Sequence, residues 1–329
     1  MLTLSVLDQS PVRRGGTAAE ALRETVELAK AAERLGYARY WVSEHHNSAG
    51  FAGTAPEILI GQIAAATSRI RVGSGGVMLS HYSALKVAEQ FRILNAFYPG
   101  RIDLGIGRAP GSDQLTAAAL AYPKAIMAIE HFPRQVLDLI NYLTDETEAE
   151  HPFASIRAQP GSRPEQWPEV WLLGSSDYSA QLAALLGLPF AFADFFGTTA
   201  NIGPAVAELY RREFKPSEYL AAPKVNATVQ VICADTEERA QFVGSSRNLS
   251  KLNSIGAGPR VEEGEGRPRR RSGLLPPEEA SALLAGPNEQ ALVQEFRKGY
   301  VDGTPEQVRA GLLVAAERYG TDDLAIVTN

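Results

Sequence analysis

The sequence predicts a single α/β domain, residues 1–329, folded as a closed (β/α)8 barrel of the TIM-barrel type. Short β-branched or apolar runs alternate with amphipathic stretches, and this unit repeats about eight times along the chain. Several of the runs are apolar at every position, which is typical of strands covered on both faces. An open doubly wound sheet is the alternative architecture for such an alternation.

The elements follow in order along the chain. Eight runs have the composition of strands: 2–7, 39–43, 70–77, 101–107, 169–174, 189–194, 225–234 and 323–328. Intervening stretches with apolar residues three and four positions apart predict helices: 18–36, 55–67, 84–97, 177–187, 201–213 and 305–319. Gly36 and Gly320 end the first and the last of these helices, and Pro305 lies in the first turn of the last.

Two segments interrupt the alternation and are predicted as insertions within the one domain. Residues from about 144 to 168 follow the fourth unit and show little periodicity. Residues from about 254 to 277 are rich in Gly, Pro, Glu and Arg, which predicts a mobile loop or lid late in the barrel. The basic run within the second insertion follows three glutamates, so a solvated loop is favoured over contact with nucleic acid.

Composition excludes several classes of function. The net charge of −6 lacks the basic field that nucleic acid or an anionic membrane surface attracts. No apolar run is long enough for a transmembrane helix, and the N-terminus has no signal-peptide pattern. The single cysteine, Cys233, excludes an intrachain disulfide, and its apolar surroundings predict a buried position. We therefore expect a cytoplasmic protein that acts on a small molecule and binds neither nucleic acid nor membrane.

In a barrel of this kind the active site lies at the C-terminal ends of the strands. Polar residues and glycines gather there in this sequence: Asp8, Glu44, His45, His46, Gly75, Gly76, Gly107, Arg108, Gly174, Ser175, Ser176 and Asp194.

The stretch LLGSSDYSAQLAALLG predicts an anion site. Its strand ends at Gly174, and Ser175, Ser176 and Ser179 surround the start of a helix, whose free N–H groups and dipole favour a phosphate. The alternative is that Ser176 or Asp177 only caps the helix. Arg108, at the end of the preceding strand, is the kind of group that neutralises a dianion.

Two glycine-rich stretches bear on cofactor binding. GIGRAPG lacks the dinucleotide-binding spacing, because three residues separate Gly107 from Gly111 and Pro110 has no N–H. GSGGVML places Gly75 and Gly76 inside a predicted strand, where glycine often marks a bulge or the close approach of a ligand. A flat aromatic ring lying against Gly75 and Gly76 would need this absence of side chains.

The adjacent histidines His45 and His46 are poorly placed to share a metal, because neighbouring side chains of an extended segment point to opposite sides. The other three histidines offer no metal-ligand spacing, so we expect no metal site. Each of the two is either a structural imidazole beside Glu44 or, at the end of its strand, a group able to exchange protons near neutral pH.

The order of these motifs resembles the luciferase-like, flavin-dependent monooxygenases, and most of all their alkanal monooxygenase-like branch. The resemblance runs through LSVLDQSP, YWVSEHHN, VGSGGVML, AEQFRILNAFYPGRIDLGIGRAPGSD and LLGSSDYSAQLAALLGLPFAFADFF. It implies a noncovalent, reduced FMN that reacts with O₂ to oxygenate a small organic substrate. It also implies a homodimer, with the flavin reduced by a separate NAD(P)H:flavin reductase or in place. Members of the family continue beyond the position of Asn329 into a final helix. We expect a partner subunit or the insertion to cover the side of the barrel that this helix covers in the family.

By position, the resemblance implies roles for individual residues. His45 matches a catalytic histidine beside the reactive edge of the flavin, and Gly75 and Gly76 match a cis peptide against which the ring rests. The residues that match the phosphate-binding positions are Arg108, Ser175, Ser176 and Ser179, next to Gly174. We also expect an apolar patch of Phe51, Phe195 and Phe196 to shape the substrate pocket.

Two other functions remain open at this point. One is a reductase that transfers a hydride from a deazaflavin or FMN without inserting oxygen. The other is a non-enzymatic flavin-binding protein.

Overall fold

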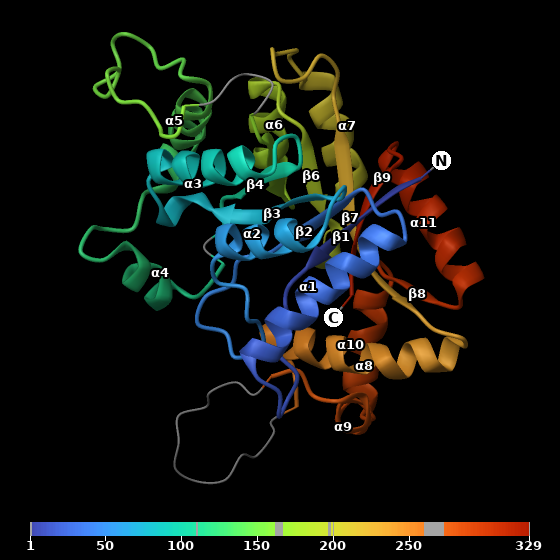
Figure 1. Cartoon of the computed structure of the whole chain (residues 1–329). Helices are drawn as coiled ribbons and strands as arrows, with labels where there is room; N and C mark the ends of the chain where they lie inside the picture. Colours follow the sequence, from blue (N-terminus) through green and yellow to red (C-terminus); the bar gives the residue numbers. More distant parts are fainter. Residues whose placement is uncertain are drawn as a thin grey trace.

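The computed structural model describes residues 2–109, 111–161, 167–196, 199, 201–259 and 273–328. All strands except β8 close into a parallel barrel, in the order β1–β2–β3–β4–β5–β6–β7–β9, and β9 pairs with β1. Strand β8 pairs with the end of β7 beyond the part of β7 that contacts β9. Helices surround the strands, and α4 projects from one side (Figure 1). The (β/α)8 barrel prediction is confirmed.

The strands are β1 (Thr3–Asp8), β2 (Arg39–Val42), β3 (Arg71–Met78), β4 (Ile102–Gly107), β5 (Glu169–Gly174), β6 (Phe190–Ala193), β7 (Val225–Cys233), β8 (Val301–Gly303) and β9 (Asp323–Val327). The α-helices are α1 (Ala18–Arg34), α2 (Pro56–Ala66), α3 (Ala84–Phe97), α4 (Gln114–Ala121), α5 (Phe132–Thr144), α6 (Asp177–Leu186), α7 (Gly203–Glu213), α8 (Glu237–Ser254), α9 (Pro277–Leu283), α10 (Pro287–Arg297) and α11 (Pro305–Tyr319). Short 3₁₀ turns are η1 (Leu79–His81), η2 (Ile129–His131) and η4 (Asp194–Phe196).

Each predicted strand is present, with ends within one residue of the prediction, and each predicted helix is present with ends within two. Local chemistry explains several boundaries. Thr17 and Glu20 form a capping box at the start of α1, and Thr304 and Gln307 form one at α11. Gly320 ends α11 in the left-handed conformation that favours glycine.

The sequence analysis did not predict α4, α5, α8, α9, α10 or β8. Within the first predicted insertion, residues 145–161 form neither helix nor strand. Most of the second insertion, residues 260–272, lies outside the described residues.

The barrel strands bury both of their faces. Alternate residues such as Ile102, Leu104 and Ile106 of β4 join the main core cluster between strands and helices. A separate cluster fills the barrel interior and contains Leu7, Trp41, Trp171, Ala191 and Val327.

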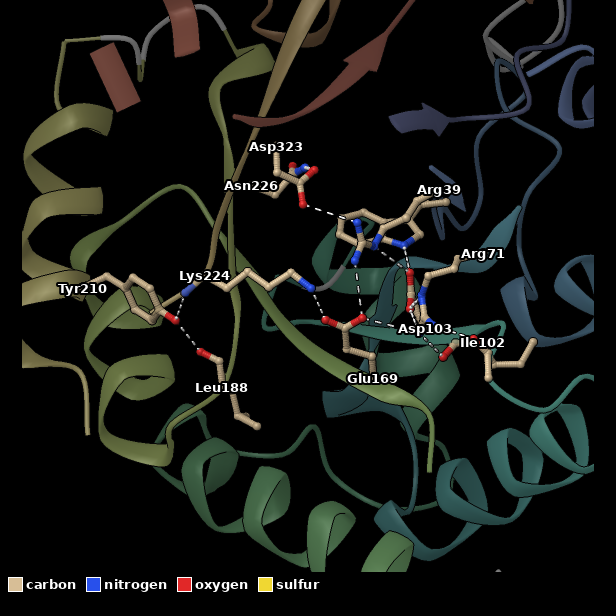
Figure 2. A network of polar contacts seen from close by, with 12 residues as sticks. Arg39, Arg71, Ile102, Asp103, Glu169, Leu188, Tyr210, Lys224, Asn226 and Asp323 are labelled. Atoms are coloured by element: carbon tan, nitrogen blue, oxygen red, sulfur yellow. Dashed lines mark hydrogen bonds and ion pairs between the residues drawn. The ribbon is translucent and has the colours of Figure 1, made fainter. Parts of the chain in front are cut away.

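Charged groups occupy the end of the interior where the strands begin. We call this set the floor network; its members are Arg39, Arg71, Asp103, Glu169, Lys224 and Asp323. Figure 2 shows how they converge from different strands. The three cations and three carboxylates balance in charge.

Asp103 lies at the centre of the floor network, with its side chain fully buried. Its carboxylate accepts a hydrogen bond of 2.8 Å from Nε of Arg71 and one of 2.9 Å from Nε1 of Trp41. Nε of Arg39 lies 3.2 Å away. Burial raises the pKa of this carboxyl, while the guanidinium groups of Arg71 and Arg39 act in the opposite direction.

We expect Asp103→Asn to lower the free energy of unfolding by about 3 kcal/mol or more, because it leaves three cations of the floor network with only two carboxylates. Urea unfolding monitored by circular dichroism measures the change. Glu27→Gln, which breaks the exposed Lys30–Glu27 pair, is the control and should cost about 0.5 kcal/mol or less. Equal losses in the two variants would show that the floor network is not a major stabilising element.

Candidate active site

Three adjacent strands bring the predicted cofactor residues together. Gly75 of β3 pairs in register with Gly105 of β4, which pairs with Trp171 of β5. The C-terminal ends of β3, β4 and β5 therefore lie side by side, each followed by part of the predicted site.

The peptide bond between Gly75 and Gly76 is cis, as the resemblance implies. A Cβ atom on Gly75 would overlap the side chain of Leu7 and lie 3.2 Å from Cβ of Trp41. A Cβ atom on Gly76 would lie 2.6 Å from the carbonyl oxygen of Gly105. Both positions thus exclude side chains on packing grounds, and we call this pair the glycine ledge.

Arg108 lies beside the first turn of α6. Its guanidinium stacks over the ring of Tyr178, 4.3 Å from the ring centroid. In the described part of the chain no carboxylate forms an ion pair with Arg108. A cation thus faces the start of a helix whose first N–H groups favour an anion.

Ser176 is the N-cap residue of α6, yet its side chain makes no capping hydrogen bond. The capping alternative is therefore not met by Ser176, while the carboxylate of Asp177 accepts a hydrogen bond of 2.8 Å from the backbone N–H of Tyr178 in the first turn. We call the end of the barrel where the strands have their C-terminal ends the mouth. Ser175 and Ser176 are both partly exposed there, next to Gly174. Their hydroxyl groups and the helix N–H groups make a donor set suited to a phosphate.

Ser179 is placed differently from the other two serines, because it is buried. Its Cβ and Oγ both lie 2.5 Å from the position that a Cβ on Gly174 would take. Gly174 therefore allows the first turn of α6 to pack closely against the end of β5. The structure gives Ser179 and Gly174 a packing role at the N-terminus of α6.

His45 lies at the end of β2 with its ring held on two sides. The ring stacks on Phe51, with centroids 4.7 Å apart, and Nδ1 lies 3.2 Å from Oγ of Ser43. The backbone N–H of His45 donates to the carbonyl of Gly53, which fixes the loop that carries Phe51. Burial, and to a lesser extent the neighbouring His46, lowers the pKa of His45 to about 4. The imidazole is therefore neutral at pH 7 and a weaker base than the unperturbed group expected from sequence.

His46 points away from His45 and is bonded to Glu44, with 2.6 Å between Nε2 and Oε1. The buried Glu44 carboxylate also accepts from the hydroxyl of Tyr82 at 2.6 Å and from the backbone N–H of Met78 at 2.9 Å. Burial, together with this hydrogen bond, raises the pKa of Tyr82, so its hydroxyl stays protonated and donates. The His46 imidazole is thus bonded within its own loop, as the structural alternative expects, while Glu44 joins the ends of β2 and β3 through Met78.

Three predictions about individual positions were wrong. The Asp8 carboxylate does not reach the mouth, because it accepts hydrogen bonds from Thr25 of α1 and from Tyr40. Asp194 is buried beside α11, 3.7 Å from Arg318, and burial raises its pKa to about 6. Cys233 is exposed, because it is the last residue of β7 and lies beyond the apolar run.

The predicted phenylalanine patch is divided. Phe51 packs on His45, and Phe195 packs against the cluster inside the barrel. Phe196 is 41% exposed, with the ammonium of Lys251 5.4 Å from its ring centroid. Phe51 and Phe195 are therefore placed to line the mouth.

The sequence analysis missed the polar residues on the inner face of β7. Asn226, Thr228 and Gln230 alternate with apolar residues that join the main core cluster. This period-two pattern, V-N-A-T-V-Q-V, was the available signal, because an inward polar residue in a barrel strand requires a partner.

A cavity of about 470 Å³ opens at the other end of the barrel, where the strands begin. It is lined by residues such as Arg71, Trp167, Glu169 and Tyr219, and no residue of the predicted site contributes to it. Among the described residues no group of three or more His, Cys, Asp or Glu is arranged to hold a metal ion. None of the described helices is long and apolar enough to cross a membrane.

The fold and site together define a parallel (β/α)8 barrel in which a cation and a helix N-terminus lie beside a glycine ledge at the C-terminal ends of the strands. The chain belongs to the luciferase-like monooxygenase family, whose model matches residues 2–322.

Two curated relatives come from Bacillus subtilis (strain 168). The chain is 44% identical over 328 residues to the uncharacterized protein YwcH, covering 100% of this chain and 94% of the relative. It is 38% identical over 333 residues to an N-acetyl-S-alkylcysteine monooxygenase, covering 100% of this chain and 93% of the relative.

Solved structures share the same architecture. Apo-MsnO8 is 38% identical and superposes with a TM-score of 0.86, covering 100% of this chain and 93% of that one. The oxygenating constituent of 3,6-diketocamphane monooxygenase, solved in complex with FMN, shares the fold at 16% identity and a TM-score of 0.67, covering 99% of this chain and 92% of that one. An F420-dependent secondary alcohol dehydrogenase also shares the fold, at 13% identity and a TM-score of 0.65, covering 99% and 93%.

The lowered pKa of His45 predicts acid sensitivity. Between pH 6.5 and about 4 the unfolded chain binds a proton at this position and the folded chain does not, so stability falls as the pH is lowered through this range. We expect the wild type to lose about 1–2 kcal/mol more than His45→Gln between pH 7.5 and pH 5, measured by urea unfolding at both values. Replacing the exposed His131 with Gln should leave the wild-type loss unchanged. Identical losses in His45→Gln and wild type would contradict the assignment.

Proposed function

We propose that this protein is a flavin-dependent monooxygenase that uses reduced FMN and O₂ to oxygenate a small organic substrate. The observation that carries the proposal is the placement of the Arg108 guanidinium and the α6 N-terminus beside the glycine ledge, on neighbouring strands. A ligand with a flat ring and a phosphate tail suits this combination. The monooxygenase relative at 38% identity and the FMN complex on the same barrel support the same proposal.

The residues present suit FMN in their donor chemistry. Arg108, Ser175, Ser176 and the first N–H groups of α6 would hold the phosphate. The glycine ledge would lie against the ring, because neither residue carries a side chain and the pair is next to the strand ends that bear Arg108 and the serines. When bound in its reduced form, FMN would supply the two electrons that activate O₂, so that one oxygen atom of O₂ is transferred to the substrate and the other leaves as water.

The protein itself would provide a proton-transfer group and a dry enclosure. His45 is neutral at pH 7, so its Nε2, which has no hydrogen-bond partner among the described residues, can accept or relay a proton. Stacking on Phe51 and the contact with Ser43 hold the imidazole in one orientation. The apolar residues Leu7, Phe195 and Val327 exclude water from the interior below the mouth.

The phosphate assignment predicts a difference between FMN and riboflavin. We expect Arg108→Ala to weaken FMN binding about 10- to 100-fold, because it removes a charge-assisted contact with the phosphate. Riboflavin, which lacks the phosphate, should be affected less than about threefold. Fluorescence titration of both ligands measures the effect, and Arg309→Ala on the exposed face of α11 is the control. Equal losses for FMN and riboflavin would remove the phosphate from this site.

The role of His45 predicts that binding and turnover separate. We expect His45→Gln to bind FMN within about threefold of wild type but to lose about 10²-fold or more in oxygenation, because a positioned proton carrier is missing. The probes are a straight-chain aldehyde and an N-acetyl-S-alkylcysteine, supplied with photoreduced FMN and air. Product and hydrogen peroxide are quantified for wild type, His45→Gln and the control His131→Gln. Unchanged product formation in His45→Gln would exclude His45 as the catalytic group.

A further inference from the structure

A column of polar side chains rises along the inner face of β7 from the floor network toward the mouth. Asn226 donates a hydrogen bond of 2.8 Å to Asp323, a member of the floor network (Figure 2). The hydroxyl of Thr228 donates to the amide oxygen of Asn226 at 3.2 Å. The first two residues of the column are therefore satisfied by neighbours inside the barrel.

Gln230, the next inward residue, has no such neighbour. It is 5% exposed, and its buried Oε1 has no hydrogen-bond partner. The same holds if the amide oxygen and nitrogen of Gln230 are assigned the other way round, because the buried position then holds Nε2, which also has no partner there. Buried polar atoms in folded proteins are nearly always paired, and an unpaired one in a binding region indicates a group that awaits a ligand.

The register places Gln230 at the level of the mouth. It pairs with Val327 of β9, which belongs to the interior cluster with Leu7 and Phe195. Leu7 in turn packs at the position where a Cβ on Gly75 would lie. The carboxamide therefore lies within the apolar enclosure that the glycine ledge borders.

The order of strands places Gln230 across the barrel from the glycine ledge. The same number of strands separates β7 from β3 in either direction around the closed sheet. A ring lying on β3, with its phosphate beyond β4 and β5, would leave its free face toward β7. A second molecule that reacts at that face would therefore lie on the side of β7 and Gln230.

We propose that the Gln230 carboxamide binds the substrate by hydrogen bonding to its polar group, and so determines which substrates are accepted. This inference rests on the proposed function. A carboxamide is uncharged at neutral pH, and the interior cluster that Gln230 adjoins through Val327 is apolar, so it selects a neutral, mainly apolar molecule with one carbonyl or amide group.

The test uses FMN-saturated protein and two probes of nearly the same shape, 2-octanone and 2-methyloct-1-ene, which differ in a carbonyl oxygen. Calorimetric titration gives the affinity of each probe for wild type, Gln230→Met and Gln230→Leu. We expect the ratio of ketone to alkene affinity to fall about five- to tenfold in both variants, because the lost contact is a single hydrogen bond. The matched control is Gln241→Met, which removes an exposed carboxamide from α8 and should leave the ratio unchanged.

Two further measurements separate this inference from other roles of Gln230. The thermal midpoint of ligand-free Gln230→Met should equal or exceed that of wild type, since the substitution removes an unpaired polar atom at similar volume. FMN affinity should stay within about threefold of wild type, since Gln230 lies across from the ledge.

Several outcomes would overturn the proposal. These are an unchanged ketone-to-alkene ratio, failure of the ketone to bind to FMN-saturated wild type, a lowered midpoint in the ligand-free variants, or a parallel loss of FMN affinity. Failure of wild type to bind FMN would instead remove the proposed function on which the inference rests.

Discussion

The buried carboxylate of Asp103, held by Arg71, Arg39 and Trp41, is the contact on which the rest of the barrel depends. It sits among side chains from β2, β3, β5 and β9, so satisfying it requires that these strands meet in one closed sheet. Desolvating six charged groups is costly, and only the balanced pairing of the floor network offsets that cost. The consequence for function is geometric. The floor network fills the end of the interior where the strands begin, and the candidate site lies at the opposite end.

Glycines on β3 and β4 make this filling possible. A Cβ on Gly73 would lie 2.5 Å from Cβ of Asp103, and one on Gly105 would overlap the backbone of Ser74. Large inner side chains such as Trp41 and Trp171 pack edge to face across the space that these glycines leave. The glycine ledge continues the same pattern to the mouth. The glycines of β3 and β4 therefore allow close packing at three levels of the barrel: the floor network, the interior cluster and the candidate cofactor site.

The strands could be predicted from sequence because a short apolar run bounded by turn residues is a local signal. The helices that were missed lack such a signal or rely on distant partners. α8 has a polar sequence and is held by a buried, bidentate pair between Arg247 and Asp302, which no local pattern reveals. α5 is an exception, since Val136, Leu139, Ile140 and Leu143 have helical spacing and mark its buried face. Its signal was present and was overlooked beside the irregular segment that follows.

The site was harder to predict than the fold, because residue type and position along a strand do not reveal which face a side chain takes. Asp8 and Asp194 follow strands as the predicted site residues do, but both turn toward the surrounding helices. Because side chains alternate between the two faces of a strand, a shift of one residue decides whether a side chain points into the barrel or toward the helices. The serines after β5 and Arg108 after β4 could be grouped from sequence, because a strand followed directly by a helix places its end residues at the helix N-terminus.

The two histidines show what sequence could not supply. His45 and His46 are identical in type and adjacent in the chain, yet their contacts differ. His46 is bonded to the buried carboxylate of Glu44, whereas the ring of His45 stacks on Phe51 and its Nδ1 contacts the hydroxyl of Ser43. Glu44 distinguishes them. By taking His46, Met78 and Tyr82 as its three donors, it ties the ends of β2 and β3 together and leaves His45 outside the hydrogen-bonded set. Burial without a charged partner then keeps His45 neutral. His45 is therefore a neutral imidazole held in one orientation at the mouth, because the hydrogen bonds of Glu44 go to His46, Met78 and Tyr82 instead.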